Sequence, residues 1–343
     1  MSPLNQRRLA NFRANRRGWY AFWTFLVLFG LSLISEFIAN ERPILFSKGG
    51  EIYMPVLFTY TEETLGGELP TEADYRDAYV QALIIEDDGW MVWPPIRYSQ
   101  ATIDWSLEVA PAPPSRDHWL GTESLGRDIV AQLLYGFRLS VLFGLSLTLM
   151  SSIIGITVGA LQGYFGGFVD LIGQRFVEIW AGLPLLFLMI ILASLIEPNF
   201  FWLLGLLTLF GWMALVGVVR AEFLRARNFE FVRAARALGV SNRRIIIRHV
   251  LPNAMVAALT YLPFLLNGSI ATLTALDFLG FGMPYESPSL GRLLGAAQSN
   301  LQAPWIAISV FLTIATLLTL LIFIGEAVRD ALDPRRTLGV RTA

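Results

Sequence analysis

The sequence lacks most of the groups on which enzymatic sites are built. It contains no cysteine, which excludes disulfides and thiolate metal sites, and its two histidines, His118 and His249, lie far apart in the chain. The only lysine, Lys48, precedes Gly49 and Gly50, whereas a Walker phosphate loop needs a lysine after its glycines. We therefore expect this chain to bind no metal, no cofactor, no nucleotide and no nucleic acid.

Charge is scarce as well. Charged residues make up 15% of the chain and hydrophobic residues 55%, whereas soluble domains carry about 25% charged residues. A helix needs about 20 apolar residues to cross about 30 Å of hydrocarbon. Windows close to this length predict an all-α polytopic membrane protein with six transmembrane helices: Trp19–Ala39, Leu139–Gln162, Ile179–Ile196, Phe200–Val219, Met255–Leu276 and Trp305–Gly325. Gly182 and Pro184 interrupt the third window, which favours a kinked helix.

The arginines are segregated along the chain. They cluster in an N-terminal tail (1–18), in the loop 220–252 between the fourth and fifth spans, and in a C-terminal tail (327–343). Six spans place these clusters on one side of the membrane, and the positive-inside rule makes that side the cytoplasm, so both termini are expected there. A cleaved signal sequence would also suit the first span, but the residues before Asn40 lack the small-x-small pattern of a cleavage site.

A long segment, residues 40–137, follows the first span (19–39) and is expected outside the cytoplasm. It holds 16 acidic and 6 basic residues, and the alternation from Gly89 to Ile96 suggests short strands in a small subdomain. Two interpretations stay open, a solvated surface loop or a docking surface for a soluble partner. At its end, Ile129, Val130, Leu133 and Leu134 share one helical face, which predicts a helix along the membrane surface.

The expected core, residues 138–326, carries few groups suited to ion coupling. The carboxylates near the membrane lie at span edges rather than in mid-span, which disfavours an ion-driven carrier: Glu178, Asp277 and Glu326. Small residues recur on one face of the second span and predict close helix packing: Gly155, Gly159 and Gly163. The candidate substrate path consists of polar residues in the fifth span: Asn267, Ser269, Thr272 and Thr274.

The loop 220–252 contains an amphipathic insert, Phe231 to Pro252. Phe231, Ala234, Ala235 and Leu238 recur at helical spacing, and Gly239 is placed to end that helix in a left-handed conformation. Ser241 or Asn242 would then cap a second helix, which we expect Leu251-Pro252 to end. Binding to anionic lipid would explain the arginines of the insert but not this arrangement of alanine, glycine and proline.

The insert resembles the EAA loop of ABC importer permeases, in which Glu-Ala-Ala is followed after three residues by Gly and later by Ile-x-Leu-Pro. Ala234-Ala235, Gly239 and Leu251-Pro252 match at the right distances, while Arg233 and His249 replace the Glu and the Ile. The form Arg233-Ala-Ala-Arg236 is similar to the peptide-transport branch. Three further motifs point to the same branch: Gly121-Thr122 with Gly126-Arg127-Asp128, Asp277-Phe-Leu-Gly-Phe-Gly282, and Pro288-Ser-Leu-Gly291.

The resemblance implies a type I ABC importer permease of the bacterial inner membrane, most similar to the second permease of oligopeptide, dipeptide and microcin C systems. It implies a second homologous permease, two ATPase subunits on the cytoplasmic side and a periplasmic solute-binding protein as partners. The loop would act as the coupling element, through Arg233, Ala234, Ala235, Arg236, Gly239, Leu251 and Pro252. The remaining alternatives are an ion-coupled secondary transporter and a membrane scaffold.

Overall fold

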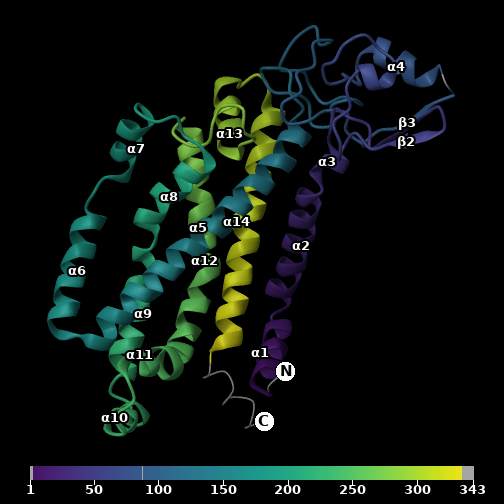
Figure 1. The fold of residues 1–343 in the computed structure, drawn as a ribbon. Coiled ribbons are helices and arrows are strands. Elements are labelled where there is room, and N and C mark those ends of the chain that lie inside the picture. Colours follow the sequence, from purple (N-terminus) through teal and green to yellow (C-terminus); the bar gives the residue numbers. More distant parts are fainter. Residues whose placement is uncertain (1–2, 87, 334–343) are drawn as a thin grey trace.

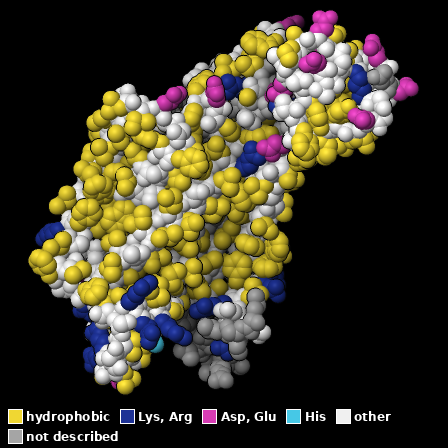
Figure 2. All heavy atoms as spheres, viewed as in Figure 1, with side chains coloured by type: hydrophobic (Ala, Val, Ile, Leu, Met, Phe, Trp, Pro, Cys, Tyr) yellow, Lys and Arg dark blue, Asp and Glu magenta, His cyan; other side chains and the backbone are white. Residues whose placement is uncertain are grey.

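The computed structural model describes residues 3–86 and 88–333. Figure 1 shows a long bundle of helices with a smaller unit containing a β-sheet at one end, while the first described helix and the end of the last described helix lie at the opposite end. Figure 2 shows Lys and Arg side chains gathered around that opposite end, and Asp and Glu side chains gathered on the smaller unit. The charge segregation of the sequence is therefore also a segregation in space.

Four helical stretches in the described part of the chain are long and apolar enough to cross a membrane. Two of them are single helices, and two are runs of consecutive elements: α5 (Ile129–Phe165), α8 (Phe200–Gly211) with α9 (Met213–Ala226), the run from α11 (Asn242–Arg244) through the π-helix η2 (Ile245–Val250) to α12 (Leu251–Phe278), and α14 (Pro304–Leu332). The pair α6 (Gly167–Ala181) and α7 (Leu185–Ala193) qualifies as one stretch bent by 61°. The kink expected at Gly182 and Pro184 is confirmed.

The first predicted span corresponds to α2 (Arg16–Leu33), which follows α1 (Pro3–Ala14) and precedes the short α3 (Ser35–Ile38). It is less apolar than the four stretches above, because it starts with Arg16 and Arg17. It nevertheless lies against α14, where a Cβ built on Gly18 would be 2.1 Å from the Cβ of Ala327. The two helices run beside each other in Figure 1, so α2 is part of the bundle.

Two expectations about helix boundaries are wrong. The residues from Ile129 to Leu134 do not form a separate surface helix, because they are the first turns of α5. At 1.5 Å per residue, the 37 residues of α5 span about 55 Å, which is longer than the hydrocarbon layer, and α5 runs diagonally across the bundle in Figure 1. Leu251-Pro252 does not end a helix either, since η2 continues into α12. Pro252, which has no N–H to donate, stands just after the π-helix η2, where the regular α-helical pattern of hydrogen bonds is already interrupted.

Small residues allow α5 to approach α9 closely. A Cβ built on Gly155 would lie 2.4 Å from the Trp212 carbonyl oxygen, and one on Gly163 would lie 2.5 Å from that of Arg220. The packing predicted from the glycine spacing is therefore confirmed. At the end of α5, α6 is held to α9 by a two-pronged ion pair, in which the Arg220 Nη2 is 2.7 Å from the Asp170 Oδ2.

The smaller unit, called the sheet unit below (residues 40–127), has its own hydrophobic core. Three strands pair antiparallel in the order β2 (Glu51–Tyr53), β1 (Leu45–Lys48), β3 (Trp90–Val92), with α4 (Ala78–Ile85) and the 3-10 turn η1 (Glu63–Leu65) beside them. Phe46, Leu65, Tyr75 and Ile84 are buried together. The helix α13 (Leu290–Ser299) lies near the sheet unit in Figure 1 and packs against α12 and α14.

Candidate functional site

The insert forms a short helix, α10 (Glu230–Ala237), at the end of the bundle opposite the sheet unit. Its inner face packs on the bundle, because Val232 and Ala235 are buried in a cluster with residues of α5, α9 and α12. One exposed side of α10 is apolar and is called its outer face below: Phe231 is 43% exposed, Leu238 is 83% exposed and Ala234 lies between them, while the exposed Glu230 and Arg233 lie on another side of the helix. The two alanines therefore have different roles, Ala235 inward and Ala234 outward.

Gly239 ends α10 with a backbone φ of +76°, so the left-handed conformation expected from the sequence is confirmed. The Val240 N–H donates to the Ala235 carbonyl and the Gly239 N–H to the Arg236 carbonyl, which closes the last turn. No heavy atom lies within 4 Å of a Cβ built on Gly239. The glycine is thus required by its backbone conformation and not by a close neighbour.

Tyr164, at the end of α5, joins the two halves of the insert. Its hydroxyl donates to the Asn242 Oδ1 at 2.7 Å and accepts from the Arg236 Nε at 3.4 Å, and the Arg236 guanidinium lies 4.9 Å from the ring centroid. Both predicted arginines are exposed, but only Arg236 contacts Tyr164. Asn242 binds Tyr164 instead of capping the next helix, and Ser241 makes no capping bond.

The remaining residues predicted for this site, Leu251 and Pro252, lie where the π-helix η2 passes into α12. They belong to the long helical stretch 242–278 and not to α10. Tyr164 was missed by sequence reasoning, although it directly follows the last glycine of the stripe, Gly163. No local pattern shows that a tyrosine in α5 contacts an asparagine 78 positions later.

The predicted substrate path divides into two pairs. Ser269 and Thr272 line a cavity of about 290 Å³ inside the bundle, together with Thr148 and Ser151 of α5. The hydroxyls of Thr148 and Ser269 are 3.4 Å apart, and the buried hydroxyl of Ser151 has no hydrogen-bond partner among the described residues.

The other two path candidates do not line this cavity. Asn267 donates to the Leu318 carbonyl of α14 at 3.1 Å, and the Thr274 hydroxyl donates back to the Ile270 carbonyl within α12. Both side chains are therefore used in helix packing, as hydroxyls and amides in membrane helices often are.

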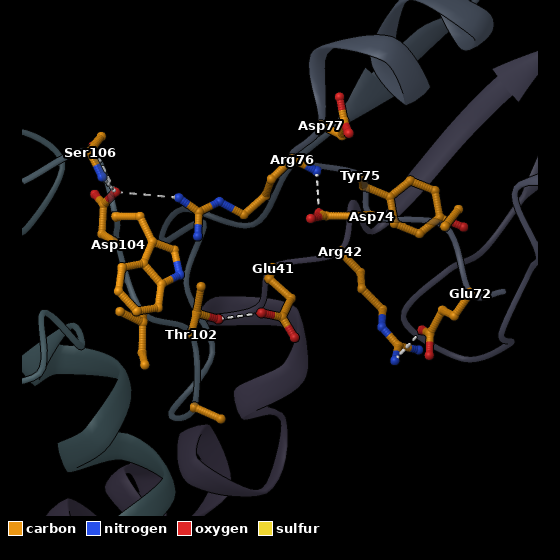
Figure 3. Close-up of a pocket in the computed structure, with 14 residues that line it drawn as sticks. Glu41, Arg42, Glu72, Asp74, Tyr75, Arg76, Asp77, Thr102, Asp104 and Ser106 are labelled. Carbon is orange, nitrogen blue, oxygen red and sulfur yellow. Dashed lines mark hydrogen bonds and ion pairs between the residues drawn. The ribbon is translucent and has the colours of Figure 1, made fainter. Parts of the chain in front are cut away.

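The sheet unit carries an open cleft of about 750 Å³ (Figure 3). Its walls are charged, with Arg42 paired to Glu72 and the Arg76 Nη2 3.7 Å from the Asp104 Oδ1. Trp105, which is 86% exposed, also lines it.

His118 connects this cleft to α5. Its Nδ1 is 2.9 Å from the Asp128 Oδ2, its Nε2 is 3.2 Å from the Asp104 Oδ2, and Asp128 also caps the first turn of α5 through the Ala131 N–H. Burial favours the neutral imidazole, but the hydrogen bonds to Asp128 and Asp104 outweigh it and raise the pKa of His118. Burial likewise opposes ionisation of Asp104, yet bonds from Ser106, His118 and Tyr98 lower its pKa to about 2.

Residues 155–338 match the family described as binding-protein-dependent transport system inner membrane component. The chain belongs to this family. It is 59% identical over 339 residues to the inner membrane ABC transporter permease protein YejE of Escherichia coli (strain K12), covering 98% of this chain and 99% of the relative. It is 54% identical over 361 residues to the peptidoglycan transport system permease protein YejE of Agrobacterium fabrum, covering 98% and 94%.

More distant relatives extend the comparison. The oligopeptide transport system permease protein OppC of Mycobacterium bovis is 39% identical over 265 residues, covering 74% of this chain and 87% of the relative. A structure of the MetNI methionine ABC transporter in an inward-facing conformation shares the fold, with a TM-score of 0.50 and 16% identity over 59% of this chain and 96% of that chain. The chain is therefore a multi-pass permease of the type I ABC importer fold in the inner membrane.

Proposed function

We propose that the chain is one permease subunit of an ATP-driven peptide importer, assembled with a second homologous permease, two ATPase subunits and a periplasmic solute-binding protein. The observation that carries this proposal is the uncovered apolar face of α10, with Phe231 and Leu238, on a chain that has no nucleotide-binding loop of its own. An exposed apolar face on a small, rigidly held helix is suited to a groove on a partner protein.

Coupling would pass from α10 to the membrane helices through Tyr164. Val232 and Ala235 anchor α10 on the bundle, and Arg236 and Asn242 hold the two arms of the loop to the end of α5. A displacement of α10 by a closing pair of ATPases would therefore move α5 as well. Rigid-body movement of this kind is one of the common routes by which transporters switch between states.

The distribution of charged residues predicts the orientation of the chain in the membrane, and an uncharged cavity between its two ends is the candidate substrate path. The arginine-rich end, with α10, would face the cytoplasm, together with both termini, by the positive-inside rule, and the sheet unit would face the periplasm. The cavity lined by Ser269 and Thr272 lies between these ends and offers hydroxyls but no charge. Such a lining can hydrogen-bond peptide groups of any sequence, because every peptide unit has one donor and one acceptor.

The cargo class rests on the relatives. One that is 54% identical is named a peptidoglycan transport permease, and another is an oligopeptide permease. Both names describe a cargo that contains peptide, so we propose peptides as the cargo class of this chain. The long sheet unit, which lies outside the family match at 155–338, is an expected feature of the microcin C type of system.

Uptake of tri-alanine into proteoliposomes holding the four membrane-associated subunits tests the proposal. We expect uptake to require ATP and the binding protein and to persist when ionophores collapse all ion gradients. Uptake that follows an ion gradient without ATP would identify the chain as part of a secondary carrier. No uptake under any of these conditions would contradict transport and favour the membrane scaffold. The double variant F231S/L238S, which removes the apolar face of α10 without touching its buried side, should lose ATP-dependent uptake.

A matched control uses apolar residues with comparable exposure at the other end of the molecule. Leu301, which is 82% exposed, and Leu69, which is 53% exposed, lie outside the insert. The double variant L69S/L301S should retain ATP-dependent uptake. Equal losses in the two double variants would show that the outer face of α10 has no special role.

A further inference from the structure

A second polar cleft, of about 230 Å³, lies where the end of the sheet unit meets the core. Three separate segments form it: residues 123–127, the first turn of α5 at Gln132, and α13 with the preceding loop at Tyr285. None of the residues proposed for coupling or for the intramembrane path lines it. Its lining combines two arginines, one glutamate and two amides, in contrast to the hydroxyls of the cavity inside the bundle.

Several polar side chains in this cleft have unused hydrogen-bonding capacity. Glu123 is only 6% exposed, and its Oε1 has no hydrogen-bond partner among the described residues. The Arg127 Nε lies 3.8 Å from that oxygen, which is close enough for an ion pair but too far for a hydrogen bond, and this buried Nε has no hydrogen-bond partner among the described residues. The amide of Gln132, which is 9% exposed, likewise has no partner within the described ranges. Buried polar groups normally have a hydrogen-bond partner, so two buried atoms without one in the same cleft, the Glu123 Oε1 and the Arg127 Nε, need an explanation.

The other arginine of the cleft is already occupied. Arg292 donates to the Met283 carbonyl at 3.1 Å and to the Pro284 carbonyl at 2.6 Å, and it also bonds the Ser287 carbonyl. It therefore holds the loop before α13 in place. Tyr285 stands between the two arginines, with its ring centroid 5.9 Å from the Arg127 Cζ and 5.5 Å from the Arg292 Cζ. Arg127 is left as the cation that can receive an anion.

The unpaired atoms define what the cleft can bind. Arg292 lies near Asp277 and is bound to the loop before α13, so the positive group that the cleft offers to an anion is the Arg127 guanidinium. Arg127 and Gln132 can donate to an anion, while the Glu123 Oε1 can only accept a hydrogen bond at neutral pH. The matching ligand has a carboxylate with an N–H group directly beside it. The C-terminal residue of a peptide, with its free carboxylate and its backbone N–H, has this arrangement.

We propose that this cleft binds the free carboxyl end of a peptide, with the carboxylate on Arg127 and Gln132 and the last peptide N–H on Glu123. The proposal rests on the proposed peptide cargo and adds a recognition subsite at the mouth of the core. The cleft has room for about one residue, so it selects for a free C-terminus and not for a particular side chain or peptide length.

The test compares tri-alanine with tri-alanine amide, which differ only in the carboxylate. We expect saturation-transfer NMR to detect tri-alanine on the full-length chain in nanodiscs, with binding of the amide at least about tenfold weaker because a charge-assisted bond is lost. In ATP-driven uptake, Arg127→Gln should raise KM for tri-alanine by about tenfold with kcat little changed, and should remove the preference over the amide. Arg127→Lys should restore part of that preference.

Arg116→Gln serves as the matched control, because Arg116 is an exposed arginine of the same unit that does not line the cleft. It should keep the preference of the wild type. Equal binding of the two peptides to the wild-type chain, or an unchanged preference in Arg127→Gln, would overturn the proposal while ATP-driven uptake of both peptides continued. Loss of ATP-driven uptake of both peptides in the wild type would instead contradict the proposed function.

Discussion

The variant Gly155→Ala should separate α5 from α9 and destabilise the bundle. A Cβ at this position would lie 2.4 Å from the Trp212 carbonyl oxygen and 3.1 Å from the Leu215 Cβ. Ordinary van der Waals contact begins at 3.4 Å, so the two helices would have to move apart by about 1 Å at this point. Because the contacting oxygen belongs to the backbone, a side-chain rotation cannot relieve the clash.

The magnitude follows from two opposing effects. Overpacking a close helix contact costs about 1–3 kcal/mol, while replacing glycine by alanine in a helix returns up to about 1 kcal/mol. We expect a net loss of about 1–2 kcal/mol of unfolding free energy. Gly205→Ala in α8 is the matched control, because no heavy atom lies within 4 Å of a Cβ built there. This variant has no clash and should be neutral or slightly stabilising.

The assay is thermal unfolding of the purified chain in mild detergent, followed by circular dichroism at one scan rate. For a chain of this size, the expected loss corresponds to an apparent Tm lower by about 1–3 °C in Gly155→Ala. Gly205→Ala should keep the wild-type Tm or exceed it. Equal shifts in the two variants would show that the glycine stripe does not set the distance between α5 and α9.

Three further predictions concern the coupling loop and the sheet unit. Gly239→Val should leave membrane insertion intact but uncouple ATP hydrolysis from uptake. The reason is that a β-branched residue at a φ of +76° is strained by about 1–2 kcal/mol or more. Gly239→Asn, which tolerates this conformation, should retain coupling. Tyr164→Phe removes the bond to Asn242 and should lower the peptide transported per ATP while the chain stays folded. The stability gained from His118, whose pKa is raised on folding, should be complete below about pH 6.5 and be lost as the pH rises through that raised pKa. The gain from Asp104, whose pKa is lowered on folding, should be complete above about pH 5 and be lost progressively as the pH falls from there through about 2.

Transport assays test the first two of these predictions, and thermal unfolding tests the third. Uptake and ATPase rates in proteoliposomes report on the first two, and wild-type coupling in Gly239→Val, or an unchanged ratio in Tyr164→Phe, would contradict the proposed route from α10 to α5. For the third, apparent Tm is measured between pH 5.5 and 9 in the wild type and in His118→Gln. The wild-type Tm should fall towards that of the variant as the pH rises, and parallel curves would refute the role of His118.

The membrane architecture could be predicted because it depends on local composition. The apolar windows gave the positions of the helices, the Gly182 and Pro184 pair gave the bend between α6 and α7, and the spacing of Gly155, Gly159 and Gly163 gave the packing face of α5. In each case the property resides in residues close together in the chain. The left-handed turn at Gly239 was predictable for the same reason.

Other features depend on contacts between distant residues and could not be predicted. The pairing of Tyr164 with Asn242 and the position of His118 between Asp104 and Asp128 arise only when separate segments come together. Asn267 and Ser269 are two positions apart in one helix, yet one binds α14 and the other lines a cavity. Their neighbours decide this difference, and a single sequence does not reveal neighbours.

The most direct test of the account is to find what touches the outer face of α10 in the assembled transporter. A photo-crosslinking amino acid at Leu238, which is 83% exposed at the end of α10, would be activated in cells that express all subunits. The account predicts a crosslink to the ATPase subunit, identified by mass spectrometry, and none from the same probe at Leu301. Crosslinking of Leu238 to lipid alone, or to the periplasmic binding protein, would contradict it.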